Sequence, residues 1–142
     1  MTEAVLEESL ERGVLALREL VDAEHEPIAR LRAFVVGYHE LALSSRQPVL
    51  GTGHAFRMLA IHLSAVAPAK SWKTFRPLRV LAYELLRAAV VEGELRTDLE
   101  IDLLAGFILS SVSTMTELAI DEADSRWPDG NQLWQLVAKG IT

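Results

Sequence analysis

The stretch AAVVEGELRTDLEIDLLAGFILSSVSTMTEL, residues 88–118, decides the fold, because it holds the end of one helix, a turn and the most apolar helix of the chain. Gly93 follows an apolar helical run and is placed to be its left-handed C-terminal cap. After an acidic turn, a helix from about Glu100 to about Asp121 is apolar nearly all round. We therefore expect that helix to be buried on most of its sides.

Part of the same helix, Leu103–Ile120, is about as long as a bilayer span. It contains five hydroxyl residues and Glu117, and acidic residues flank both of its ends. A membrane span would instead carry basic residues on its cytoplasmic side. The N-terminus is acidic and amphipathic, unlike a signal peptide. The composition therefore favours a cytoplasmic protein without membrane contact.

Outward from this stretch, apolar residues recur at helical spacing along the rest of the chain. Pro27 suits the first turn of a helix, and Pro68 ends another. The first three predicted helices cover about 2–23, 27–43 and 48–67. The fourth begins between residues 71 and 74 and ends at 92, and the fifth covers about 100–121. The sixth follows the turn at 127–130 and ends at Gly140. No segment alternates with the period of a strand. We predict a single all-α domain of six helices over residues 1–142.

Composition excludes several classes of function. Half of the 142 residues are hydrophobic, which suits a packed core. With 14 basic and 20 acidic residues the net charge is −6, so the chain as a whole repels a phosphate backbone. Cysteine is absent, which excludes disulfides and thiolate metal sites. Direct binding of nucleic acid by these residues is not expected.

The stretch around the predicted cap also carries a family resemblance. It resembles the region of tetracycline-repressor-like (TetR) regulators in which a long helix ends in glycine, a short acidic turn follows, and the buried penultimate helix begins. The residues concerned are Gly93, Glu94, Leu95 and Arg96, then Asp98, Glu100 and Asp102, then Leu104 and Ala105. The final amphipathic helix and Gly140 also match. The resemblance implies the ligand-binding and dimerisation domain of such a regulator.

Members of that family open with a helix-turn-helix domain of roughly fifty residues. Here Met1 stands nearly where the helix that follows this domain should begin. We expect this chain to lack the DNA-binding domain. Contact with DNA would then be made only through a helix-turn-helix domain that is not part of this chain. Two explanations are open: the chain is a fragment of a longer regulator, or it is a relative that naturally lacks the DNA-binding domain.

The resemblance further implies that the last two helices form a four-helix bundle with those of a second subunit. Helical spacing and small hydroxyl side chains agree with this. The predicted homodimer interface consists of Leu104, Ile108, Ser111, Met115, Leu118, Leu133, Leu136 and Val137. The alternative is that these residues pack inside one subunit.

A pocket for a small, apolar or aromatic effector is expected among the second, third, fourth and fifth predicted helices. Apolar walls with a few polar groups are typical of such sites. Its predicted lining is Phe34, Tyr38, His54, Met58, His62, Tyr83, Arg87, Ser110 and Thr114. The alternative for each histidine is a surface position or a hydrogen-bonded place in the core.

Metal, cofactor and enzyme signatures are missing from the sequence. His54 and His62 are two helical turns apart, roughly 12 Å, so they do not share one ion. Neither a nucleophile elbow nor a phosphate-binding loop with its lysine occurs. We predict an effector-binding regulator domain that is not an enzyme. The first alternative is a protein without a DNA-binding domain that pairs with full-length regulators. The second alternative, ranked below it, is a small helical enzyme.

Overall fold

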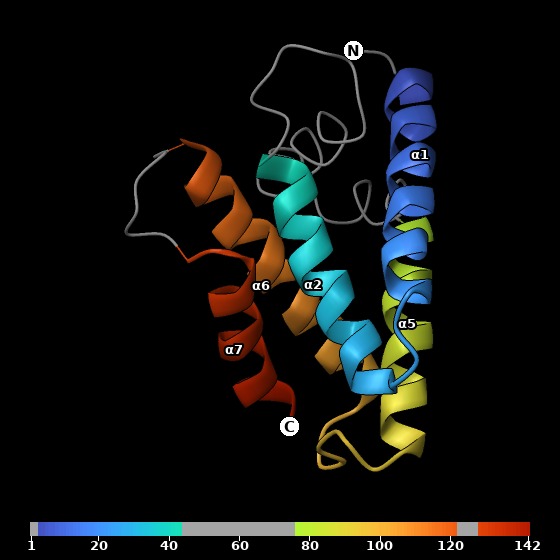
Figure 1. Cartoon of the computed structure of the whole chain (residues 1–142), viewed down its shortest axis with the longest axis vertical. Coiled ribbons are helices and arrows are strands. Elements are labelled where there is room, and N and C mark those ends of the chain that lie inside the picture. Colours follow the sequence, from blue (N-terminus) through green and yellow to red (C-terminus); the bar gives the residue numbers. More distant parts are fainter. Residues whose placement is uncertain (1–2, 44–75, 122–127) are drawn as a thin grey trace.

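The computed structural model describes residues 3–43, 76–121 and 128–142, and these residues form helices without a strand (Figure 1). The helices are α1 (Glu3–Asp22), α2 (Pro27–Leu43), α5 (Arg76–Val91), α6 (Ile101–Asp121) and α7 (Gly130–Ile141). The all-helical prediction is confirmed, and the bounds of α1, α2 and α6 agree with it closely. The predicted helix at 48–67 and the predicted start at 71–74 lie outside the described residues, so the described part has five helices rather than six.

Local sequence signals explain where the helices begin and end. At the end of α5, Gly93 has φ of +73°, its N–H donates to the Val90 carbonyl, and the Glu94 N–H donates to that of Ala89. This is the Schellman arrangement, so the predicted glycine cap is confirmed. At the start of α7, Asp129 and Gln132 form a reciprocal capping box.

Helix α2 occupies the centre of the fold. It packs against α1, α5, α6 and α7, and Figure 1 shows it between α1 and α5 on one side and α6 and α7 on the other. Gly37 permits the approach of α1, because a Cβ there would lie 2.9 Å from methyl groups of Leu17 and Leu20. The described part is therefore arranged around one central helix.

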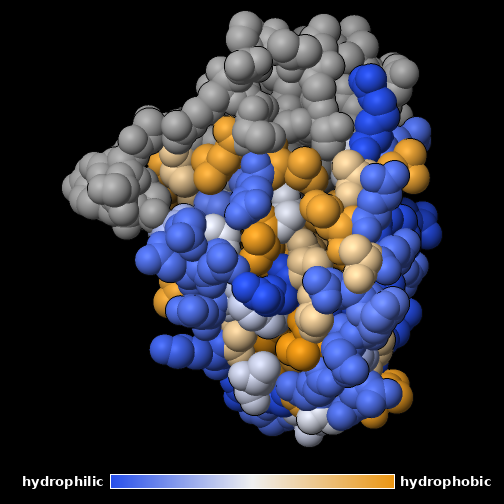
Figure 2. All heavy atoms as spheres, in the orientation of Figure 1, coloured by the Kyte–Doolittle hydropathy of each residue, from blue (hydrophilic) through white to orange (hydrophobic). Residues whose placement is uncertain are grey.

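Every described helix contributes to one core. In the view of Figure 2, hydrophilic residues cover the flanks and apolar residues show along the middle of the face. Buried side chains from the five helices include Leu17, Phe34, Tyr38, Leu81, Leu85, Leu104, Ile108, Leu133 and Val137. Within the described residues, no helix is long and apolar enough to cross a membrane.

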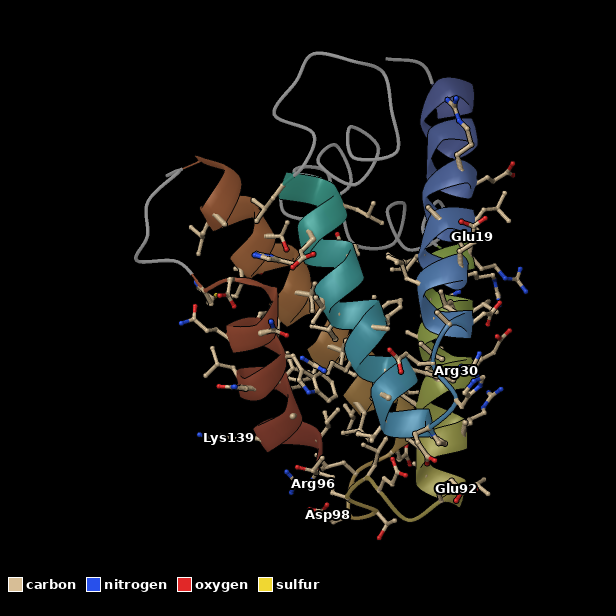
Figure 3. The ribbon with its side chains drawn as sticks, viewed as in Figure 1. Glu19, Arg30, Glu92, Arg96, Asp98 and Lys139 are labelled. Atoms are coloured by element: carbon tan, nitrogen blue, oxygen red, sulfur yellow. The ribbon has the colours of Figure 1, made fainter. Side chains whose placement is uncertain are left out.

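The α5–α6 connection is tied to the C-terminal end of α7. The backbone N–H of Arg96 donates to the Ile141 carbonyl over 2.9 Å. The Arg96 guanidinium donates to the Gly140 carbonyl and to both carboxylate oxygens of Asp98. Figure 3 shows Arg96 and Asp98 together beneath α7. These bonds hold α7 in place against the helix pair that precedes it.

Candidate functional site

The predicted dimer interface does not form one outward surface. Leu104, Ile108, Leu133 and Val137 are buried in the core of the chain itself. Met115 is partly buried and packs against that core. Ser111 and Leu118 are half-buried, which leaves Leu136 as the exposed member of the predicted set. Most of these residues therefore pack within one subunit, which is the alternative given for them above.

A different apolar stripe on α6 faces outward, one residue earlier than predicted. Leu103 is 60% exposed and Phe107 is 42% exposed, and Leu136 on α7 is 56% exposed. The two helices meet closely there, because a Cβ on Gly140 would lie 2.8 Å from the Phe107 ring. We call the exposed surface of Leu103, Phe107, Ser110, Thr114 and Leu136 the α6–α7 face. Successive residues of a helix point about 100° apart, so a shift of one residue changes the face.

The predicted effector pocket is only partly brought together. Phe34 and Tyr38 are buried in the core, whereas Ser110 and Thr114 are exposed on the α6–α7 face. Ser110 and Thr114 therefore do not line a pocket with Phe34 and Tyr38, because the rotation of α6 turns them outward. The remaining predicted members are Tyr83 and Arg87, which lie on α5, and His54, Met58 and His62, which fall outside the described residues.

The hydroxyl groups that do face α2 are those of Ser113 and Thr116, which the sequence did not single out. Ser113 Oγ lies 3.3 Å from the Tyr38 hydroxyl, and both side chains are buried. Burial raises the pKa of Tyr38, so this phenol stays protonated. The one sequence signal was the run of hydroxyl residues on α6, of which only some can point inward.

His39, also not singled out, lies fully buried beside Thr116. Its Nε2 lies 3.1 Å from the Pro128 carbonyl oxygen, which can only accept, so Nε2 carries the proton. Its Nδ1 lies 2.8 Å from Thr116 Oγ1 and accepts from that hydroxyl. Burial lowers the pKa of His39, against the opposing effect of the Pro128 carbonyl. The residue is a neutral link between α2, α6 and the turn before α7.

A second site is a pocket of about 430 Å³ on the outer side of α5. Its lining is Arg76, Arg79, Val80, Tyr83, Glu84, Arg87 and Asp102. The Tyr83 hydroxyl donates to Asp102 Oδ1 over 2.6 Å, and this bond is the main reason that the pKa of Tyr83 is raised. The Arg87 guanidinium lies 5.6 Å from the centre of the Tyr83 ring. The structure thus joins two of the predicted ligand residues in one pocket.

Metal chemistry has no geometric basis in the part of the chain that the structure describes. No group of three or more histidine, aspartate or glutamate side chains there is arranged to hold an ion. Two described features that can contact another molecule are the α6–α7 face and the α5 pocket.

Comparison of the chain with protein-family models, with curated proteins and with solved structures finds no match.

Proposed function

We propose that this chain is the effector-binding and dimerisation domain of a TetR-like transcriptional regulator. The order of the described helices and the glycine-capped end of α5 before the apolar helix α6 support this proposal. The observation that carries it is the α6–α7 face, an apolar surface on the last two helices, where the resemblance places the dimer contact.

The chemistry of the α6–α7 face suits a second copy of the chain. Leu103, Phe107 and Leu136 remain exposed although each contributes about 1.5–3 kcal/mol when fully buried. A two-fold axis through this face would bury both copies of each of these residues, because the two subunits contribute the same patch. Ser110 and Thr114 are small enough to let helices approach closely. The other described helices leave this side of α6 exposed, and a second subunit would bury it.

The sensing half of the proposal is supported by the α5 pocket. Tyr83 joins this pocket to Asp102 in the first turn of α6, and Asp102 is followed by Leu103 of the α6–α7 face. A ligand with different affinity for two arrangements of α5 and α6 would shift the balance between them. In a regulator of this kind that shift would alter how two subunits sit, and with them their DNA-binding heads.

Sedimentation velocity over a range of concentrations tests the dimer. The wild-type chain should sediment at twice the 15.7 kDa subunit mass, and Phe107→Glu should be a monomer with the same helical content. The charge would be desolvated in the dimer without a partner, which costs several kcal/mol. Leu15→Glu is the matched control, because Leu15 is 63% exposed on α1 and outside the face. A wild-type monomer, or a Phe107→Glu dimer as stable as the wild type, would refute this interface.

A further inference from the structure

We propose that the α5 pocket binds a small aromatic carboxylate, with the arginines holding the acid group and Tyr83 and Val80 contacting the ring. The inference deepens the proposed function and rests on it, because it names the class of ligand for the pocket that supports the sensing role. It concerns the face of α5 opposite the core, because the residues of the pocket alternate with the buried stripe that includes Leu78, Leu81 and Leu85.

The charge of the α5 pocket favours an acidic ligand. Arg76, Arg79 and Arg87 bring three positive charges against the two carboxylates of Glu84 and Asp102. The pocket is therefore net positive on a chain whose net charge is −6. Oppositely charged small molecules are drawn to such a local potential, and Arg forms two parallel hydrogen bonds with a carboxylate.

Both carboxylates of the pocket already have other partners. Glu84 Oε2 accepts from Arg18 Nη1 on α1 over 3.3 Å, and Asp102 Oδ1 accepts from Tyr83. Among the described residues, neither Arg76 nor Arg87 has a carboxylate within ion-pair distance. Two guanidinium groups at the pocket are thus available for an acid group from a ligand.

The middle of the pocket is lined by an aromatic and an aliphatic side chain. Tyr83 and Val80 lie between Arg76 and Arg87 along α5. The Cα atoms of the two arginines are roughly 16 Å apart at a rise of 1.5 Å per residue. The bond to Asp102 fixes the Tyr83 ring, and Arg87 lies over that ring. An ordered aromatic face beside a guanidinium suits a planar apolar group that carries an acid, since each end of the ligand meets its own kind of surface.

Size agrees with this class of ligand. The volume of about 430 Å³ falls within the range of roughly 300–1,000 Å³ that is usual for small-molecule sites. A bare inorganic anion would use the arginines and leave Tyr83 and Val80 without contact. The combined surface therefore selects an aromatic acid over phosphate or sulfate.

Isothermal titration calorimetry with benzoate and 1-naphthoate tests the proposal on the full chain, with benzamide and inorganic phosphate as comparison ligands. Both carboxylates should bind, and each should bind at least about tenfold more tightly than benzamide or phosphate. Arg87→Gln should weaken carboxylate binding by about tenfold, the usual loss when a charge-assisted hydrogen bond is removed. Tyr83→Ala should weaken naphthoate more than it weakens phosphate.

Arg12→Gln is the matched control, because it removes one exposed arginine from α1 and so changes the net charge equally. It should bind benzoate like the wild type. Phe107→Glu should also retain binding, which separates this test from that of the dimer. Equal affinity for benzamide, equal affinity for phosphate, no binding at all, or equal losses in Arg12→Gln and Arg87→Gln would each overturn the proposal.

Discussion

At the scale of single residues, His39 shows how a polar side chain is accommodated in an apolar core. It is fully buried, and both ring nitrogens have partners, Thr116 on α6 and the Pro128 carbonyl. A buried polar group without such partners would cost about 1–3 kcal/mol. These two bonds also fix the tautomer, so the neutral ring orients α6 and the start of α7 against α2.

The lowered pKa of His39 predicts a loss of stability in mild acid. The unfolded chain takes up a proton near the ordinary pKa of 6.5, whereas the folded chain resists it. The contribution of His39 is therefore fully present above pH 6.5 and is lost as the pH falls through the lowered folded value. Urea midpoints measured between pH 7.5 and pH 5 should decrease toward acid.

The variant His39→Phe checks the assignment of this pH dependence. It should lower the free energy of unfolding by about 1–3 kcal/mol, because Thr116 and the Pro128 carbonyl lose their partner. It should also flatten the dependence of the urea midpoint on pH. His25→Gln, which changes an exposed histidine, should keep the wild-type slope. The other histidines are common to all three proteins, so an unchanged slope in His39→Phe would contradict the role given to His39.

At the scale of elements, the ends of the helices are set by local chemistry and could be predicted from the sequence. Pro27 opens α2 and Gly93 caps α5 where the sequence placed them. Such signals need no tertiary contact, because a fixed φ or a missing Cβ acts on the backbone alone. The Ser113 and Thr116 contacts were not predictable in this way, since they depend on the rotation of α6 against α2.

Two glycine substitutions should have opposite effects on stability. A Cβ would meet no atom within 4 Å at either Gly93 or Gly106, so only the backbone conformation distinguishes them. Gly93→Ala should destabilise the protein by about 1–2 kcal/mol, because φ of +73° is left-handed. Gly106→Ala, within α6, should stabilise it by up to about 1 kcal/mol. Urea unfolding of both variants beside the wild type measures the difference, and equal signs would contradict this account.

At the scale of the whole molecule, the proposed dimer links the stability of the fold to the concentration of the chain. Each tenfold rise in protein concentration adds about 1.4 kcal/mol to the free energy that separates a folded dimer from unfolded chains. The thermal midpoint of the wild type should therefore rise by a few degrees per tenfold increase. Calorimetry of Phe107→Glu should show a midpoint that does not depend on concentration. A concentration-independent midpoint in the wild type would contradict the dimer.

The rotation of α6 also decides which variant tests the interface cleanly. Met115 follows the predicted seam, yet it is partly buried and packs against the core. Met115→Arg would therefore weaken the subunit itself as well as any dimer, because its charge would be placed beside apolar core groups. Phe107 lies on the exposed stripe, so its substitution reports on association with less effect on folding.

The sequence by itself determined the helical class and the ends of its helices, because periodicity and the punctuation by proline and glycine act within a few residues. Only the tertiary structure decided which stripe of α6 faces inward. That helix is apolar nearly all round, so the spacing of 103, 107, 110 and 114 is as helical as that of 104, 108, 111 and 115. Packing against α2, α5 and α7 buries Leu104 and Ile108 of the second stripe and partly buries its other two residues. The first stripe stays exposed, because each side of a helix is covered only where a neighbour lies.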